Sequence, residues 1–386
     1  MKKILYTVFV MAAMAGLVLA PAGCGANDDG PNGASGIPAQ GEPPADAPTV
    51  DSDGAATPPT DAPDAGGATA GASISPGFTG PVLDDLPPVP AEAEEGLVAE
   101  TERDWAIARG MVDWIRAQRL ESLPTGEVMA ILSATFVGAP YEPGTLELPG
   151  EERLVVNLRT FDCVTLVEHA LVLARLAADP AVDPDNEDAF GQAYRTELTD
   201  LRYRGGQIDG YPSRLHYFSE WIEQATDRGV LRDVTEEVAA SAGALEMDDR
   251  PIHFMTSNPQ AYRQLDEDPA LLDDIRAVEE RLSAVPRPFI PQDRIAQVED
   301  GIENGDILAA VSSVDGLDIA HTGLALRHEG RLHMIHAPLV GDSVELTGRP
   351  LAERMQDISG QMGVRVLRPL APGTSAPAGA PPGGTP

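Results

Sequence analysis

Basic residues are scarce in this 386-residue chain: 27 Lys and Arg stand against 61 Asp and Glu, which gives a net charge of -34. Lysine occurs only at Lys2 and Lys3, and residues 25–100 contain neither Lys nor Arg. A chain this acidic does not hold nucleic acid or an anionic membrane surface by bulk electrostatic attraction. We therefore expect no nucleic-acid partner.

Large apolar residues are few in two segments, residues 24–97 and 371–386, which are rich in Pro, Ala and Gly. Segments of this composition bury too little apolar surface to offset the entropy lost on ordering. We expect a disordered acidic tether over residues 24–97 and a disordered tail over residues 371–386. The remaining residues, 98–370, have a normal size for one folded domain.

The N-terminus has the pattern of an export signal, because an apolar run over residues 4–20 follows Lys2 and Lys3. We expect a signal peptide over residues 1–23. Pro21-Ala22-Gly23-Cys24 resembles a lipoprotein processing site, although Pro21 stands where Leu is usual. The expected protein is exported to the periplasm and held at a membrane, the outer one, by lipid on Cys24. Cleavage by an ordinary signal peptidase is the alternative.

Cysteine is also scarce, since the chain has only Cys24 and Cys163. A disulfide between them would join the flexible tether to the folded domain. Lipidation of Cys24 would forbid that disulfide and leave Cys163 as a free thiol. A lone thiol in an oxidising compartment calls for an explanation.

Hydrophobic periodicity predicts helices first and strands later, which is the order of an α+β domain. The expected helices cover residues 101–120, 125–136, 161–178, 213–228 and 269–284. The expected strands cover residues 307–311, 319–327, 331–336, 343–346 and 363–367.

Cys163 is expected in the first turn of a helix that begins near Asp162. Asp162 or Thr160 would cap the free amides of that helix. The partial positive charge at a helix N-terminus favours thiolate over thiol, and an activated thiol also needs a nearby base. The alternative is that Cys163 is a small buried residue of the core.

Two histidines are expected on one face of a hairpin. If Glu329-Gly330 is the two-residue turn, Arg327 faces Leu332 and Gly323 faces His336. His321 and His336 then become diagonal neighbours, about 7–8 Å apart at Cβ. Gly323 would leave space for the two rings to approach. His321 would serve as a base and His336 as its orienting partner. We expect their face to look toward the N-terminus of the Cys163 helix, because a base must come within reach of the thiol, and we expect His328 and His333 to lie away from it. Idle hairpin histidines, or a metal site formed with Cys163, are the alternatives.

The run Phe161-Asp162-Cys163-Val164-Thr165-Leu166-Val167-Glu168 resembles the cysteine motif of the DUF1460 group, described as N-acetylmuramoyl-L-alanine amidase-like. That group belongs to the NlpC/P60-type, papain-like superfamily of cell-wall hydrolases. Further segments fit in the same order: Ala139-Pro140-Tyr141, Gly144-Thr145-Leu146-Glu147, Ser213-Arg214-Leu215-His216-Tyr217-Phe218, His253-Phe254-Met255-Thr256, Asn304-Gly305-Asp306-Ile307, Gly316–Gly323 and Ile335-His336-Ala337. The family usually has Ser where this chain has Pro338.

The resemblance implies a papain-like α+β domain with a central antiparallel sheet and the nucleophile at a helix N-terminus. It implies that Cys163 is the nucleophile, His321 the general base and His336 the third polar residue, with neither metal nor cofactor. Tyr141, Ser213 and Arg214 are the expected substrate-binding residues.

The implied activity is hydrolysis of an amide bond in peptidoglycan or a muropeptide. A stem-peptide endopeptidase, a zinc amidase and a non-catalytic wall-binding lipoprotein are the alternatives.

Overall fold

The computed structural model describes residues 87–88, 91, 93 and 96–373. The predicted signal peptide, Cys24 and most of the predicted tether and tail lie outside these residues. None of the helices in the described part combines the length and the apolarity that crossing a bilayer requires.

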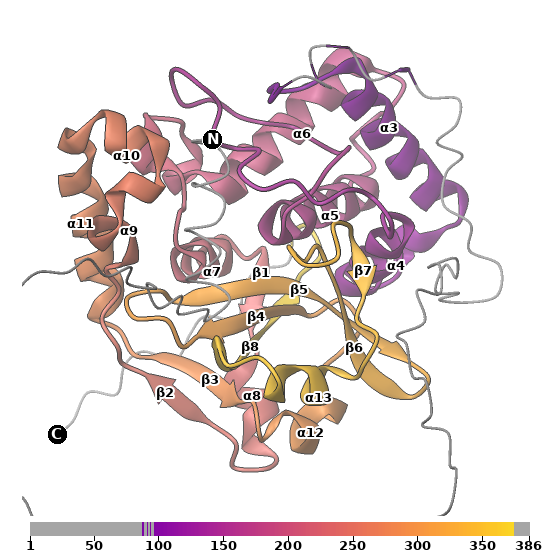
Figure 1. Ribbon diagram of the computed structural model, residues 1–386. Helices are drawn as coiled ribbons and strands as arrows, with labels where there is room; N and C mark the ends of the chain where they lie inside the picture. Colours follow the sequence, from indigo (N-terminus) through magenta and orange to yellow (C-terminus); the bar gives the residue numbers. More distant parts are fainter. Residues whose placement is uncertain (1–86, 89–90, 92, 94–95, 374–386) are drawn as a thin grey trace, which may run out of the picture. The chain divides into compact units, whose positions relative to one another are not determined.

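The helices and strands of the described part follow one another in an α+β order (Figure 1). The helices are α3 (Glu102–Ala117), α4 (Thr125–Thr135), α5 (Cys163–Ala178), α6 (Glu187–Arg202), α7 (Phe218–Asp227), α8 (Thr235–Ala240), α9 (Phe254–Ser257), α10 (Arg263–Glu267), α11 (Leu272–Ser283), α12 (Ile295–Val298) and α13 (Leu351–Gln356). The strands are β1 (Leu231–Asp233), β2 (Glu246–Asp248), β3 (Arg287–Pro291), β4 (Ile307–Ser312), β5 (Ile319–His328), β6 (Arg331–His336), β7 (Glu345–Leu346) and β8 (Gln361–Pro369).

Within the described residues the strands form one eight-stranded sheet in the order β2-β3-β8-β4-β5-β6-β7, and β1 pairs with β8 off this path. The strand pairs are antiparallel. The predicted α+β class with a central antiparallel sheet is therefore confirmed. The papain-like assignment stays a prediction.

Helices cover both faces of the sheet (Figure 1), and the central strands are therefore buried on both sides. On one face, Leu324 and Leu326 of β5 join a core that includes the apolar residues of α3, α4 and α5. On the other face, Ala325 of β5 and Met334 of β6 join a core with α8, α12 and α13. Successive strand residues point to opposite faces, so Leu324 and Leu326 enter one core and Ala325 enters the other.

The sequence fixes the start of α5 locally. Asp162 is extended, and its side chain accepts hydrogen bonds from the amides of Val164 and Thr165, while the Thr165 hydroxyl accepts from the amide of Asp162. This reciprocal cap satisfies amides that a helix N-terminus leaves without partners. Leu166, Leu173 and other apolar residues of α5 are then fully buried in the core.

The structure differs from the predicted elements in three places, one helix start and two sets of elements that were not predicted. The helix expected from residue 213 begins at Phe218, because Tyr211–Ser213 form a separate 3-10 turn that contains Pro212. Helix α6 was not predicted, although its buried Phe190 and Leu198 recur at helical spacing. Strands β1 to β3 were also not predicted, because their pairing with distant strands decides their conformation.

Candidate active site

The β5–β6 hairpin has the predicted register. Glu329 and Gly330 have φ values of 50° and 80°, as both central residues of a type I′ turn require. Arg327 faces Leu332 across the strands, as predicted.

That register brings His321 and His336 together. Nε2 of His321 lies 2.8 Å from Nδ1 of His336, and the two rings are nearly perpendicular, at 83°. Gly323 makes the approach possible, because a Cβ on this residue would lie 2.9 Å from the Cβ of His336 and 2.6 Å from the carbonyl oxygen of Ile335. The predicted contact between the two histidines, and the predicted need for glycine opposite His336, are both confirmed.

Cys163 is the first residue of α5 and is half-buried, with a free thiol. The Thr322 hydroxyl donates a hydrogen bond to the carbonyl oxygen of Cys163 at 2.8 Å. Thr322 also lowers the pKa of the Cys163 thiol, against the larger effect of burial. Since Thr322 directly follows His321 in β5, the first turn of α5 contacts the residue next to the predicted base.

One part of the predicted geometry needs correction. We expected the face that carries both histidines to look toward the N-terminus of α5. Thr322 faces α5, so alternation along β5 turns His321 toward the opposite face, where the positive charge of Arg354 in α13 reaches it. The first turn of α5 nevertheless contacts β5 at Thr322, the residue next to His321.

Burial keeps both partners neutral at rest. Burial, followed by the charge of the Asp162 carboxylate, raises the pKa of the Cys163 thiol to about 11. Burial, followed by the charges of His336 and Arg354, lowers the pKa of His321 well below its usual range. The expected lowering of the thiol pKa by the helix N-terminus is therefore outweighed, first by burial and then by the negative charge of Asp162 at the same helix end.

Tyr141 lies beside the nucleophile. The backbone of Tyr141 forms an isolated parallel β-bridge with Phe161, which lies two residues before Cys163. Burial raises the pKa of the Tyr141 hydroxyl, and the nearby charges of Cys163 and Asp162 raise it further. The structure thus brings Tyr141 to the site, as a substrate-binding role requires.

Ser213 and Arg214 have structural partners of their own. The Ser213 hydroxyl accepts from the amide of Asp209 at 2.9 Å and donates to a carbonyl oxygen at 2.7 Å. Arg214 is buried, and its guanidinium pairs with Glu147 at 2.5 Å and with Glu152 at 3.3 Å. Its charge is already compensated, so a substrate carboxylate would compete with two carboxylates, and the substrate-binding role of both residues stays a prediction.

Glu345 of β7 and Arg354 of α13 are site residues that the sequence did not indicate. Oε1 of Glu345 lies 3.4 Å from Nε2 of His336, because β6 and β7 set these two residues opposite one another. Arg354 is half-buried, and its charge lowers the pKa of both His321 and His336. Only the pairing of β7, a two-residue strand, could have identified Glu345.

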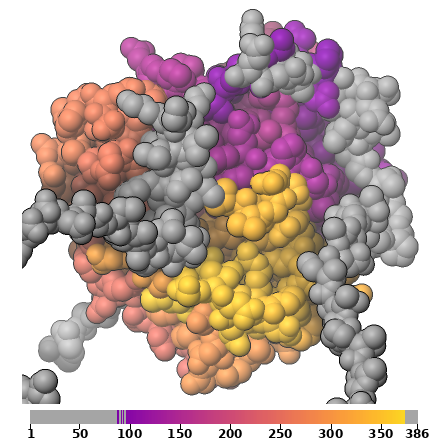
Figure 2. Space-filling model, in the orientation of Figure 1, coloured from indigo at the N-terminus to yellow at the C-terminus, as the bar shows by residue number. Residues whose placement is uncertain are grey.

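The segment before β7 also contacts the N-terminal part of the domain. The amide of Tyr141 donates to the carbonyl oxygen of Asp342, and that of Gly138 donates to Val344. Figure 2 shows the C-terminal strands, in yellow, bordering the purple N-terminal helices on this side of the domain. The segment of residues 138–141 and the segment that leads into β7 are thus joined by main-chain hydrogen bonds.

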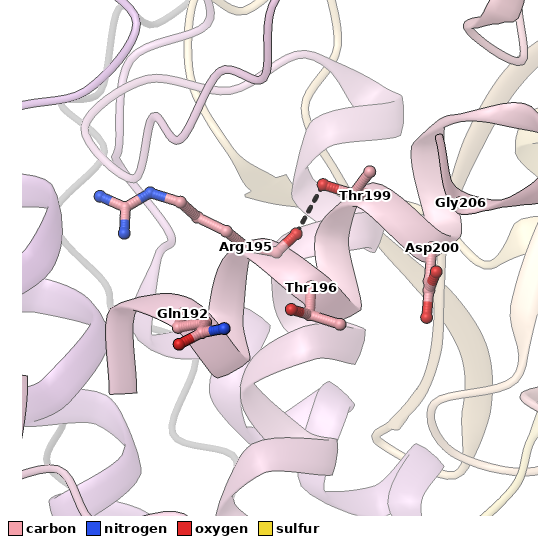
Figure 3. Close-up of a pocket in the computed structure, with 6 residues that line it drawn as sticks. All are labelled: Gln192, Arg195, Thr196, Thr199, Asp200 and Gly206. Atoms are coloured by element: carbon pink, nitrogen blue, oxygen red, sulfur yellow. Dashed lines mark hydrogen bonds between the residues drawn. The ribbon is translucent and has the colours of Figure 1, made fainter. Parts of the chain in front are cut away.

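The described part of the chain offers neither a metal site nor a second pocket that contains the predicted site residues. No three side chains of His, Cys, Asp or Glu lie there in an arrangement that would hold a metal ion. A surface hollow of about 320 Å³ lies along α6 and is lined by residues such as Arg195, Thr199 and Asp200 (Figure 3). Its lining includes none of the predicted site residues, and the Thr199 hydroxyl there donates to the Arg195 carbonyl within the helix.

The family model described as N-acetylmuramoyl-L-alanine amidase-like matches residues 131–362, which is more than half of the chain. Two solved structures of an N-acetylmuramoyl-L-alanine amidase from Bacteroides uniformis are 32% and 33% identical to this chain, each with a TM-score of 0.57. Each match covers 64% of this chain and 99% or 98% of the other.

A Legionella pneumophila protein described with DUF1460 is 18% identical, with a TM-score of 0.50 over 70% of this chain and 95% of its own, and so supports the fold alone. None of the curated proteins matches the chain. With a family model over residues 131–362 and an α+β fold that the solved amidase structures share, the chain belongs to the N-acetylmuramoyl-L-alanine amidase-like family.

Proposed function

We propose that this protein hydrolyses the amide bond between N-acetylmuramic acid and L-alanine in peptidoglycan or muropeptides, with Cys163 as nucleophile and His321 as general base. The observation that carries the proposal is the hydrogen-bonded His321–His336 pair, next to Thr322, whose hydroxyl binds the carbonyl oxygen of Cys163. Nucleophile, base and orienting group in this order are the parts that thiol hydrolysis needs. The NlpC/P60 resemblance supports the same roles.

The resting protonation states support general-base catalysis. Burial keeps the Cys163 thiol and the His321 imidazole neutral near pH 7, because it raises the pKa of the first and lowers that of the second. Nε2 of His321 is engaged by His336, so Nδ1 is the nitrogen that would take the thiol proton. The thiolate would thus form during attack on the carbonyl carbon.

In the acylation step the sulfur bonds to the lactyl carbonyl carbon, and the carbonyl oxygen becomes an oxyanion. The amides of Val164 and Thr165 donate to the side chain of Asp162. The amide of Cys163 does not bind this cap, so it is the helix-end donor that could bind the oxyanion. His321 then gives its proton to the leaving amine as the carbon–nitrogen bond breaks. The result is a thioester and a free stem peptide.

In the deacylation step His321 takes a proton from water, and the hydroxide attacks the thioester carbonyl. The carbon–sulfur bond breaks, and the proton returns to the sulfur. Tyr141, whose hydroxyl pKa responds to the charge of Cys163, would contact the sugar or the first amino acid of the substrate. The products are a muramic acid carboxylate and a peptide with a free alanine amine.

The test is digestion of purified muropeptides with the full chain, followed by mass spectrometry of the fragments. We expect release of intact stem peptide from the sugar and no cleavage inside the peptide. Cys163→Ala should abolish release without changing the thermal unfolding profile. Fragments cut within the stem would support the endopeptidase alternative, and full activity in Cys163→Ala would end the thiol mechanism.

We further propose that the enzyme is a periplasmic lipoprotein anchored through Cys24, with residues 98–370 as its catalytic domain. The N-terminal signal pattern and the Pro-rich acidic segment support this arrangement. Metabolic labelling with a fatty acid should mark the wild-type protein and not Cys24→Ala. A mature protein with an unmodified Cys24 thiol would rule out the anchor.

A further inference from the structure

Glu345 lies at the far end of the histidine pair. His336 is fully buried, with 0% of its surface exposed. Its Nδ1 contacts His321, but its Nε2 is a buried atom without a hydrogen-bond partner among the described residues. A buried polar atom of this kind calls for an explanation. The Glu345 carboxylate, 3.4 Å away, is the acceptor that the fold sets beside it.

The backbone holds Glu345 in this place. In β7 it stands opposite His336, while the preceding Val344 exchanges main-chain hydrogen bonds with residues 138 and 139 at 2.8 Å each. The side chain remains 42% exposed, so water reaches the carboxylate, whereas the ring of His336 is buried. The separation exceeds a standard hydrogen bond, as is common at catalytic sites without substrate.

An ionised carboxylate only accepts hydrogen bonds, so it favours the form of His336 that carries hydrogen on Nε2. The Nδ1 of His336 is then an acceptor, and His321 must donate to it from its own Nε2. That leaves the lone pair of His321 on Nδ1. The opposite tautomers would put hydrogen on Nδ1 of His321, which could not take a proton from a thiol.

We propose that Glu345 is a positioning residue that fixes His336 and His321 in the tautomers that leave Nδ1 of His321 as the base. This inference rests on the proposed function, because it gives His321 the base role. Glu345 touches no reacting atom and acts through His336 alone. Groups that orient a functional histidine from behind typically matter about 10–100-fold.

Three charged or titratable groups face His336: His321, Glu345 and Arg354. Burial lowers the pKa of His336, the Glu345 carboxylate opposes this, and the Arg354 cation adds to it. Arg354 therefore favours neutral rings, while Glu345 decides which nitrogen of a neutral ring carries the hydrogen. The two residues have separate effects, so a substitution of Glu345 should change the tautomers of His336 and His321 and not only the local charge.

The test compares Glu345→Gln with Glu353→Gln in the full chain. Glutamine keeps the size of glutamate but either donates or accepts, so it no longer selects one tautomer. Glu353 is an exposed acid of α13, next to Arg354, and its loss changes the net charge equally. Imidazole ¹⁵N spectra at pH 7.5 read the tautomers directly, with signals assigned from His321→Gln and His336→Gln.

We expect hydrogen on Nε2 of both rings in the wild type and in Glu353→Gln, and averaged nitrogen shifts in Glu345→Gln. We also expect kcat to fall about tenfold in Glu345→Gln, with KM unchanged. Unchanged ¹⁵N shifts in Glu345→Gln, or an equal kcat loss in Glu353→Gln, would overturn the inference. If the wild type released no stem peptide, the proposed function would fail, while the ¹⁵N spectra would still decide the tautomers.

Discussion

Two histidine pairs lie on the same hairpin, and only one has the surroundings of an active site. His321 and His336 form a perpendicular pair with ring centroids 5.0 Å apart, and His328 and His333 form another at 5.4 Å. In the first pair two ring nitrogens meet at 2.8 Å, next to Thr322, which binds the carbonyl oxygen of Cys163. In the second, Nδ1 of His333 instead donates to the carbonyl oxygen of Thr347 at 2.7 Å.

The two pairs have similar ring spacing and orientation, so these features alone do not identify a catalytic base. A backbone carbonyl fixes His333 as a donor and ties it to the fold, whereas Glu345 and Arg354 set the proton position and the charge of the other pair. His328 and His333 also lie away from His321, as predicted. The neighbours on each face of the sheet therefore give the two pairs different chemical surroundings.

The largest expected contrast is between His321→Ala and His328→Ala. Loss of the base should lower kcat/KM by about 10³-fold or more, because the thiol then has no group to take its proton. His328→Ala should change kcat/KM less than about twofold, since His328 lies beside the turn, away from Cys163. Rates of stem-peptide release measure both, and equal losses would mean that the comparison is wrong.

A smaller contrast separates His336→Asn from His333→Asn. His336→Asn should lower kcat by about 10–100-fold, because His321 loses its orienting partner. His333→Asn should keep kcat but lower the free energy of unfolding by about 1–2 kcal/mol, since a buried hydrogen bond to Thr347 is weakened. Urea unfolding and kcat measured on the same samples test this split. A stable but inactive His333→Asn would contradict it.

The pH profile of kcat/KM distinguishes neutral partners from a preformed ion pair. The His321 pKa is lowered, so the acid limb should fall below pH 6.5, where His321 would become protonated and stop accepting. The Cys163 pKa of about 11 predicts a flat profile from pH 7 to above pH 9. A basic limb near pH 8–9 would require an imidazolium whose pKa is raised by a neighbouring thiolate, and would show that thiolate and imidazolium exist before substrate binds.

The smallest expected effect is on stability in acid. Below pH 6.5 the unfolded chain binds a proton at His321, whereas the folded protein resists it because the folded pKa is lowered. Stability should therefore fall as pH drops from 7.5 to 5, and His321→Gln should reduce that fall by about 1 kcal/mol, discounted because the ring is partly exposed. Parallel thermal scans measure it. An identical fall in both proteins would mean that the His321 pKa is not lowered.

Local pattern was enough to predict much of the core of the fold. Helix α5, strand β6 and the Glu329-Gly330 turn lie where periodicity, capping and turn chemistry put them. Each of these signals acts within a few residues, so the chain carries it without help from distant parts. The contact between His321 and His336 follows from the turn alone, because the turn fixes the register.

The face on which that pair would lie could not be predicted in the same way. Both faces of β5 are apolar, so the sequence did not say which one α5 would cover. The structure assigns α5 to the face of Thr322 and leaves the histidines to α13.

The sequence by itself determined the α+β class, the capped start of α5 at Cys163 and the register that joins His321 to His336. The tertiary structure alone decided which groups surround them. Glu345 comes to His336 only because a two-residue strand pairs with β6, and Arg354 only because α13 covers that face. The pKa values followed from these neighbours and from burial, since the energy of a charge depends on what desolvates it and on which charges lie within a few ångströms. The periodicity of apolar residues along the chain does not predict the distances between these groups in the folded protein.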